Sequence, residues 1–338
     1  MKIRNRTRFA VLAVTLTTCL TASAATNFTN PGGLVSDGGN WDNGLPTGTN
    51  QGTIDINASA DSTVSLSGYN VTQTGGVFSH TGLSAVSLVD NTTWQINGAS
   101  ASTNVNFRGF NVRSGSAFTL TTGTVNTTSG RDWALGDAGS TLTINGGSMN
   151  FGRSLIMQGS AGAVFTINAG TAQGSGSIGG NNIQDNTHTL NFNGGASTFA
   201  NLDLRGDNTF FNLGGSTAGS LTAATVNTGG TFGTNSSLNW LPGSLMTLTL
   251  TDTVNFAGFA EAYWNSGRLL FDGDSSADLG LSWADASNSA VGLGGGYFWD
   301  FDNTSNTLSL AAVPEPSSLA LLGTGMAALL GFRRRLRA

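Results

Sequence analysis

Short runs of alternating apolar and polar residues recur through most of the chain. Each run places two apolar side chains two positions apart with a polar residue between them, at Ile54/Ile56, Val64/Leu66, Trp94/Ile96, Val105/Phe107, Phe118/Leu120, Leu142/Ile144, Phe165/Ile167, Leu190/Phe192 and Leu202/Leu204. A period of two with one apolar face is typical of a β-strand that is buried on one side. Between the two ends of the chain, no helical pattern longer than about ten residues competes with it. The body is therefore predicted to be all-β.

Glycine-rich turns lie beside these runs. They supply the left-handed backbone positions that tight corners need, at Gly75-Gly76, Asn97-Gly98, Ser114-Gly115, Asn145-Gly146-Gly147, Asn168-Ala169-Gly170, Asn193-Gly194-Gly195, Gly214-Gly215 and Gly229-Gly230. The average interval between turns is about 22 residues, and single intervals run from 15 to 32. A period of about 20–25 residues is typical of a solenoid.

Two architectures fit this pattern. In a β-helix, two or three short strands separated by glycine corners make one coil, and stacked coils bury a narrow apolar interior. In a β-sandwich, the Asn-Gly pairs would instead be hairpin turns between antiparallel strands. The β-helix is favoured because apolar residues recur at equivalent points of the period, and the irregular spacing keeps the sandwich open as an alternative.

The repeat body is assigned to residues 25–236, and the parts at its two ends differ from it. Residues 25–52 are predicted to cap the open end of the stack, because Trp41 lies there among turn residues; sugar stacking by Trp41 is the alternative. Residues 237–312 hold four of the seven Trp and longer strand patterns, at Leu245 to Leu250 and Thr307 to Leu310. They are predicted to form a C-terminal β module that closes the stack, with aromatics buried rather than exposed to polysaccharide.

The body contains no pattern that selects a catalytic centre. Glycoside hydrolysis needs two carboxylates at a controlled separation, and nothing pairs Glu261, the one Glu of the body, with a particular Asp. His80 and His188 lie about a hundred residues apart and are expected at the surface or in turns. Arg131 and Asp132 are expected to form a surface ion pair. We predict no enzymatic activity, no catalytic residue and no cofactor.

Two groups of Asp raise the question of calcium. Asp272, Asp274 and Asp278 form one group, and Asp300 and Asp302 form the other, but neither has the ligand spacing of an EF-hand loop. Asx turns are the simpler interpretation. No metal site is predicted.

Basic residues are concentrated at the two ends of the chain. Between residues 25 and 313, six Arg stand against eighteen acidic residues, which makes a formal charge of −12. Such a body should repel nucleic acid. The single cysteine, Cys19, falls in the N-terminal segment, so the body has neither a disulfide nor a cysteine-based metal site.

The first 24 residues have the pattern of an export signal. Basic residues from Lys2 to Arg8 precede the apolar run around Phe9 to Val14, and Ala22-Ser23-Ala24 follows. Signal peptidase recognises this order of charge, apolar core and small residues, and cleavage after Ala24 is expected. The export machinery and signal peptidase are therefore predicted partners.

The C-terminal segment, residues 313–338, has three parts. Pro314, Glu315 and Pro316 precede an apolar stretch that is predicted to be a transmembrane helix over residues 318–332, and the basic cluster Arg333, Arg334, Arg335 and Arg337 ends it. As a helix the sixteen residues from Ser317 to Phe332 are about 24 Å long, so they can span a bilayer core of about 30 Å if the Arg side chains snorkel. The positive-inside bias holds the Arg end in the cytoplasm and leaves the body outside.

This tail resembles the PEP-CTERM sorting signal in its Pro314-Glu315-Pro316 motif, its apolar stretch and its Arg-rich end. The resemblance implies recognition and cleavage by an exosortase, in bacteria that make an exopolysaccharide matrix. It also implies transient anchoring in the inner membrane before transfer to the cell surface or release. It implies no activity for the body.

Two hypotheses follow for the body. The first is a structural or adhesive protein of the extracellular matrix without catalytic activity. The second is a polysaccharide-binding or polysaccharide-cleaving β-helix, with exopolysaccharide as its partner. A groove with clustered Asp and Arg on one face of the stack would favour an enzyme, whereas smooth faces of Thr and Asn would favour the structural role.

Overall fold

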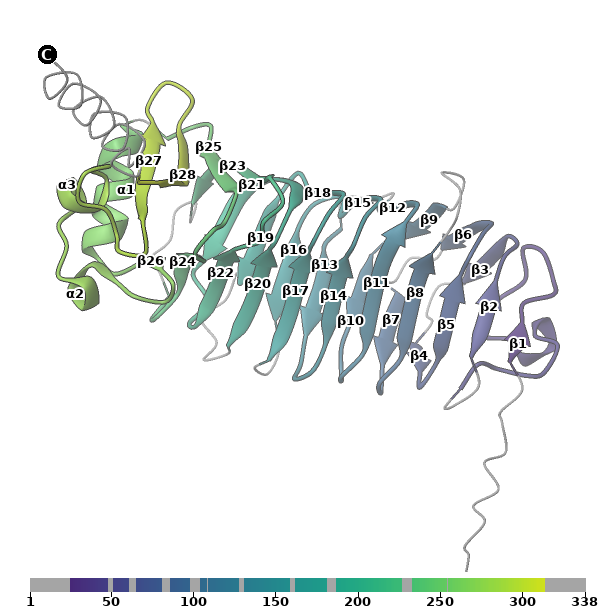
Figure 1. Cartoon of the computed structure of the whole chain (residues 1–338). Coiled ribbons are helices and arrows are strands. Elements are labelled where there is room, and N and C mark those ends of the chain that lie inside the picture. The colour runs from purple at the N-terminus through teal and green to yellow at the C-terminus, as the bar shows by residue number, and fades with distance from the viewer. Residues whose placement is uncertain are drawn as a thin grey trace, which may run out of the picture.

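The body of the chain winds through about eight turns of a β-solenoid (Figure 1). The structure is a computed structural model and describes residues 25–313 except 48–50, 61–64, 81–85, 98–103, 108, 128–130, 159–161, 181–186, 227–232 and 254. The predicted signal peptide and the predicted transmembrane helix lie outside the described residues. Among the helices of the described part, none has the length and apolar character needed to cross a membrane.

One side of the solenoid, which we call face A, is a continuous parallel sheet. Each of the complete turns contributes one strand to it, and further strands extend the sheet at its two ends. In spatial order the strands are β1 (Thr26–Asn27), β2 (Gly52–Ile54), β5 (Asn70–Gln73), β8 (Thr93–Asn97), β11 (Ala117–Thr122), β14 (Thr141–Ile144), β17 (Ala163–Ile167), β20 (His188–Phe192), β22 (Thr209–Leu213), β24 (Ser237–Trp240) and β26 (Leu269–Phe271).

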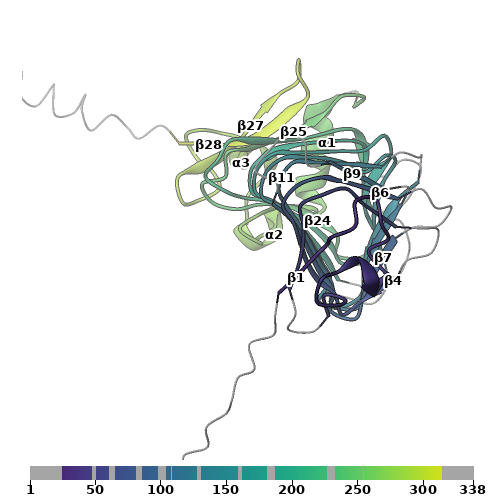
Figure 2. The same cartoon turned by 90° about the vertical axis from the view of Figure 1, so that its right-hand side faces the viewer.

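Two further faces complete each turn, and the view along the stack shows a three-sided outline (Figure 2). Face B consists of β3 (Ala58–Ala60), β6 (Val77–His80), β9 (Asn104–Phe107), β12 (Thr124–Thr127), β15 (Ser148–Asn150), β18 (Thr171–Gln173), the first parts of β21 (Gly195–Leu204) and β23 (Gly219–Val226), and β25 (Met246–Leu250). Face C consists of β4 (Ser65–Ser67), β7 (Val86–Val89), β10 (Phe110–Val112), β13 (Trp133–Gly136), β16 (Leu155–Gln158), β19 (Ser177–Gly180) and the last parts of β21 and β23.

Strands of successive turns pair in parallel, so that equivalent residues lie one above another. In face A, Phe118 pairs with Leu142 and Leu142 pairs with Phe165, which places partners 24 and 23 residues apart in the chain. A hairpin sandwich requires antiparallel pairs between consecutive strands, whereas the described strands β1 to β26 pair with one another in parallel. The predicted β-solenoid is confirmed and the sandwich alternative is wrong.

The alternation of residue types decides which side chains lie inside. Leu142 and Ile144 are fully buried, whereas Thr143 between them is partly exposed. The buried side chains form a column along the axis, in which the rings of Phe192 and Phe211 stack with centroids 6.0 Å apart. Because each ring contacts residues of the turns above and below it, a chain with few large apolar residues still builds a close-packed core.

The corner between faces A and B holds most of the predicted glycine turns. The segments 145–147 and 168–170 each link a strand of face A to the next strand of face B. Their Asn side chains form a ladder, in which Nδ2 of Asn168 donates to Oδ1 of Asn145 at 2.7 Å and Nδ2 of Asn193 donates to Oδ1 of Asn168 at 2.9 Å. Ser114-Gly115 lies instead at the corner between faces C and A. The predicted turn signals therefore came from two different corners, and this is why their spacing is uneven.

Residues 25–47 cover the N-terminal end of the stack and include the short 3-10 helix η1 (Gly38–Asn40). Trp41 is 4% exposed, packs edge-on against Phe28 and donates its Nε1 hydrogen to the carbonyl oxygen of Val35 at 3.0 Å. Backbone hydrogen bonds from this segment to Ser59 cover the first strand of face B. The Trp41 ring is thus enclosed and cannot stack on a sugar.

The stack continues past residue 237, since β24, β25 and β26 pair in parallel register with the strands before them. Beyond β25 come α1 (Phe256–Asn265), α2 (Ser276–Leu279), α3 (Trp283–Ala286) and an antiparallel hairpin of β27 (Tyr297–Asp302) and β28 (Thr307–Ala312), which pack at this end (Figure 1). The prediction of a β module did not include these helices. Phe256, Ala260 and Trp264 recur at every fourth position and bury one side of α1, a signal that is short but helical.

The tryptophans of this terminal part lie inside, as predicted. Trp240 and Trp264 pack against Trp299 with ring centroids 5.3 and 5.9 Å away, and all three are fully buried. The strands predicted at residues 245–250 and 307–310 are confirmed as β25 and β28. β28 pairs antiparallel with β25, so that the hairpin covers the last strand of face B.

The expectation that the two His lie at the surface or in turns is wrong. His80 and His188 are each 4% exposed and lie within β6 and β20. His188 shares the inward phase of Leu190 and Phe192, and His80 shares that of Phe78. The same alternation that predicted the strands therefore places both imidazoles inside.

Burial lowers the pKa of His188. The folded chain therefore binds a proton on this imidazole only at a lower pH than the unfolded chain, whose His has a pKa of about 6.5. We expect the free energy of unfolding to fall as the pH drops below about 6.5, by at most about 1.4 kcal/mol per pH unit for this group. Thermal unfolding at pH 7.5 and pH 5.0 should show a smaller loss for His188→Gln than for the unaltered protein. An equal loss in both proteins would contradict this assignment.

Candidate functional site

Faces A and B each carry a row of outward side chains that consists mostly of uncharged polar groups. Along face A one row contains Thr119, Thr143, Thr166, Asn191, Asn212 and Asn239. Along face B an equivalent row contains Thr124, Ser148, Thr171, Ala196, Ser220 and Thr247. Nδ2 of Asn212 donates to Oδ1 of Asn191 at 3.0 Å, so the amides are hydrogen-bonded from turn to turn. Both faces therefore present hydroxyl and amide groups at the strand spacing of about 4.8 Å.

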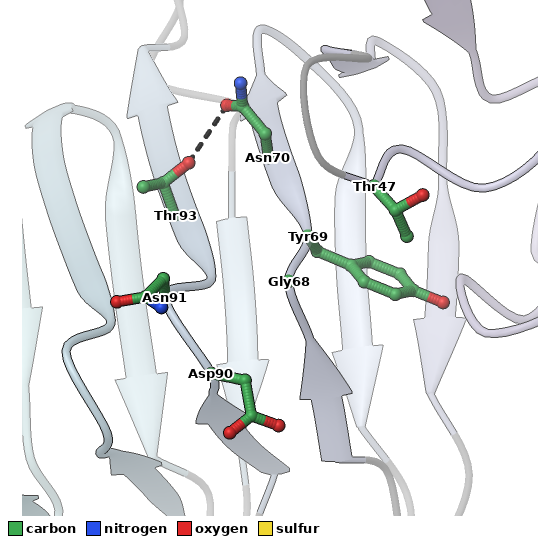
Figure 3. A pocket seen from close by; sticks show the side chains of 7 residues that line it. All are labelled: Thr47, Gly68, Tyr69, Asn70, Asp90, Asn91 and Thr93. Carbon is green, nitrogen blue, oxygen red and sulfur yellow. Dashed lines mark hydrogen bonds between the residues drawn. The ribbon is translucent and has the colours of Figure 1, made fainter.

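A pocket of about 370 Å³ opens near the N-terminal end, at the corner between faces C and A (Figure 3). Tyr69 and Asp90 line it together with Thr47, Gly68, Asn70, Asn91 and Thr93. The carboxylate of Asp90 accepts a hydrogen bond from Ser67 at 2.7 Å, and Thr93 donates to Asn70 at 2.9 Å. The lining supplies hydroxyl and amide groups but a single carboxylate, which is not the pair that glycoside hydrolysis needs.

A second hollow of about 510 Å³, which we call the groove, lies on face C, and charged side chains are part of its lining. Arg131, Asp132 and Arg153 form its charged wall. Asp132 accepts hydrogen bonds from Nε of Arg153 at 2.7 Å and from Nη2 of the same guanidinium, and this contact raises the pKa of Arg153. The expected ion pair of Asp132 thus exists, but its partner is Arg153 of the next turn instead of the neighbouring Arg131.

The floor of this groove is apolar. Ala134 of β13 and Ile156 of β16 are partners in register, and both occupy outward positions of face C. Asn111 stands on the same row one turn earlier, and Gln158 lines the groove two positions beyond Ile156. Two guanidinium groups, one carboxylate and two amides therefore surround a small apolar floor.

The buried ion pair of the solenoid is part of its framework. Asp203 has no exposed surface and accepts hydrogen bonds from Nε and Nη2 of Arg205 at 2.9 and 2.5 Å. This contact raises the pKa of Arg205, so its guanidinium stays charged. A carboxylate enclosed in this way is not accessible to a ligand.

Two of the five Asp residues considered for calcium form an Asx turn and a helix cap. Asp302 accepts a hydrogen bond from the backbone N–H of Thr304, and Asp278 forms a capping box with Ser275 at the start of α2. These hydrogen bonds lower the pKa of both carboxyl groups. Among the described residues, no three His, Cys, Asp or Glu side chains come together in a way that could hold a metal ion.

The predicted processing residues lie outside the described part of the chain. They are Ala22 and Ala24 of the signal cleavage site, Pro314, Glu315 and Pro316 of the sorting motif, and Arg333, Arg334, Arg335 and Arg337 of the basic cluster. β28 ends at Ala312, directly before the tail begins. The solenoid thus places the start of the tail at its C-terminal end.

The fold and the tail together define a β-solenoid that ends in a C-terminal sorting signal. The family model of the PEP-CTERM protein-sorting motif matches residues 312–335, so the chain carries this motif. The motif implies an exported, cell-surface-directed protein that is processed by an exosortase. Comparison with curated proteins and with solved structures gives no match.

Sequence reasoning missed the groove because its residues come from three successive turns. Arg131 and Arg153 are 22 residues apart, which equals the average interval between the predicted turns. Applying that period to the charged residues of the body would have placed the two Arg on neighbouring turns. The apolar floor carries no comparable signal, since Ala134 and Ile156 are ordinary strand residues.

Proposed function

We propose that the protein is a non-catalytic structural or adhesive component of the extracellular matrix, which an exosortase delivers to the cell surface. The observation that carries this proposal is the combination of the PEP-CTERM motif with solenoid faces of stacked hydroxyl and amide groups. Rows of this kind offer many weak hydrogen bonds along an extended surface. Such a surface suits contact with hydrated polymers better than the turnover of a single bond.

Two hollows of the described surface bear on catalysis, and the groove on face C gathers two Arg with a single Asp instead of the clustered Asp expected of an enzyme. The corner pocket contains one carboxylate, Asp90, and the groove contains one, Asp132, which is held by Arg153. Hydrolysis of a glycoside by the common route needs two carboxylates about 5–10 Å apart. Neither hollow provides such a pair.

Sorting requires the tail in this proposal. The N-terminal signal exports the chain, the apolar segment anchors it briefly in the inner membrane with its Arg end in the cytoplasm, and the exosortase acts at Pro314-Glu315-Pro316. Cleavage there frees the solenoid from its anchor.

The test is to compare the distribution of variants between membrane, cell surface and medium. The full chain should reach the surface, whereas Pro314→Ala combined with Pro316→Ala should accumulate in the membrane, with at least about a tenfold loss of surface protein if motif recognition contributes about 1.4 kcal/mol or more. Leu336→Ala lies outside the matched residues and is the control, with an unchanged distribution. If the motif variant and a deletion of residues 314–338 both distribute like the full chain, the sorting proposal is wrong.

A polysaccharide-binding role is the second candidate, and the groove on face C favours it. Its apolar floor and polar rim match the two sides of a sugar ring, which has an apolar C–H face and hydroxyl groups around its edge. Binding and adhesion are compatible, because a surface protein that holds matrix polymers must contact them. Cleavage of a polysaccharide would be a separate activity, which a reducing-end assay on acidic and neutral glycans would detect.

A further inference from the structure

We propose that the groove on face C binds a carboxylate-bearing polysaccharide through Arg131 and Arg153. This inference rests on the proposed function only for the location of the protein, outside the cell among matrix polymers. The ligand chemistry follows from the charges, the register and the floor of the groove.

The groove gathers cations on a body that is otherwise acidic. Residues 25–313 carry a formal charge of −12. Two other Arg are already committed to the framework: Arg205 to Asp203, and Arg268 to the carbonyl oxygens of Gly233 and Ser236 at 2.6 and 3.0 Å. Arg153 is paired with Asp132 but stays exposed, and together with Arg131 it lines one hollow, where two Arg against one Asp leave a net positive charge for an anionic ligand.

The strand register places these two Arg on neighbouring turns. Trp133 pairs with Leu155, so the positions two residues before each of them, 131 and 153, are equivalent. Adjacent turns are about 4.8 Å apart. This spacing lets one carboxylate, or two successive carboxylates of a polymer, interact with both guanidinium groups.

Asp132 orients Arg153 without using all of its donors. It binds the side of the guanidinium formed by Nε and Nη2, so Nη1 lies on the opposite side. The next turn carries Gly176 at the equivalent position, where an added Cβ would lie 3.0 Å from Cγ of Arg153. The missing side chain leaves room for the stem of Arg153, whose side chain remains 56% exposed.

The rest of the groove suits a sugar chain. Ala134 and Ile156 provide an apolar floor, and Asn111 and Gln158 provide amide donors and acceptors beside it. A volume of about 510 Å³ falls in the range of small-molecule sites. A planar guanidinium binds a carboxylate through two parallel hydrogen bonds, so a uronic acid residue would use Arg131 more fully than a neutral sugar.

The test measures binding of the full chain in mild detergent to polygalacturonate and to neutral dextran, at low and high salt. We expect binding to polygalacturonate that weakens at high salt, because it depends on charge, and at least tenfold weaker binding to dextran. Arg131→Gln should lower the affinity for polygalacturonate by about tenfold or more, since a charge-assisted hydrogen bond contributes about 1.5–3 kcal/mol. Arg131→Lys keeps the positive charge but lacks the planar, two-donor geometry of a guanidinium. Its affinity for polygalacturonate should therefore lie between those of the unaltered protein and Arg131→Gln.

Arg113→Gln is the matched control, because Arg113 is an exposed Arg after β10 that does not line the groove. It removes the same charge and should change the affinity less than twofold. Equal losses for Arg113→Gln and Arg131→Gln, equal binding of dextran and polygalacturonate, or no binding of polygalacturonate at low salt would each overturn the inference. Arg131→Gln should still reach the cell surface, so a failure of glycan binding is distinguishable from a failure of sorting.

Discussion

Replacing Phe211 by alanine is expected to lower the free energy of unfolding by about 3–5 kcal/mol, the usual cost of removing a large aromatic ring from a core. Phe211 has no exposed surface and stacks on Phe192 of the previous turn with ring planes 3° apart. The cavity left behind would lie in the middle of the stack. Turns on either side would lose the contacts that hold them in register.

The neighbouring residue provides the control for this experiment. Phe210 belongs to the same strand but points outward and is only partly buried, so Phe210→Ala should cost less than about 1 kcal/mol. Denaturant unfolding followed by circular dichroism would measure both variants. Similar losses in the two proteins, or a larger loss for Phe210→Ala, would show that the inward and outward phases of β22 are wrongly assigned.

Gly215→Ala is expected to destabilise the protein by about 3 kcal/mol, because it combines left-handed strain of about 1–2 kcal/mol with overpacking of about 1–3 kcal/mol. Gly215 has φ +86°, and a Cβ added to it would lie 1.9 Å from the carbonyl oxygen of Asn193 in the turn below. The backbone must move to make room for this Cβ. The backbone that moves belongs to the corner between faces A and B, which carries the Asn ladder.

Gly273→Ala separates the two contributions to this cost. Gly273 has φ +89°, close to that of Gly215, but a Cβ there meets nothing within 4 Å. Only the conformational strain of about 1–2 kcal/mol should appear in this variant. Chemical denaturation of both proteins would measure the difference, and equal losses would mean that the turns are not packed as closely at this corner as the structure places them.

The alternation of residues predicts the solenoid and most of the strands assigned from it, although β2 ends at Ile54 and leaves Ile56 of the predicted Ile54/Ile56 run outside the strand. Runs such as Leu142-Thr143-Ile144 specify which side chains point inward, and the stacked turns then follow from the recurrence of such runs. The two His residues show that the alternation also indicates burial for polar side chains. His188 lies in the same phase as Leu190 and Phe192, and only its polarity suggested the surface.

The helices at the C-terminal end could not be predicted with the same security. α1 is ten residues long, and its buried positions Phe256, Ala260 and Trp264 are four residues apart. Short irregular segments also show this spacing by chance. Its stability comes from packing, since Trp264 and Trp299 bury each other at the end of the stack. Packing of this kind depends on residues far apart in the chain.

Predicting the groove required the register of the strands as well as the sequence. Arg131 and Asp132 are adjacent in the chain, and the adjacent pair was the natural expectation. In the structure the carboxylate reaches instead to Arg153, because the register of β13 and β16 places Arg153 beside it on the neighbouring turn. Charged pairs separated by one period are thus the signal to search for in chains of this type.

We propose that the C-terminal motif directs the β-solenoid to the cell surface, where the solenoid is freed from its anchor. Intact-mass spectrometry of the chain recovered from the surface and the medium tests it most directly. We expect a mature chain that begins at Ala25 and ends near Pro314-Glu315-Pro316, without the apolar stretch and the Arg cluster. Recovery of a surface chain that still extends to Ala338 would contradict it.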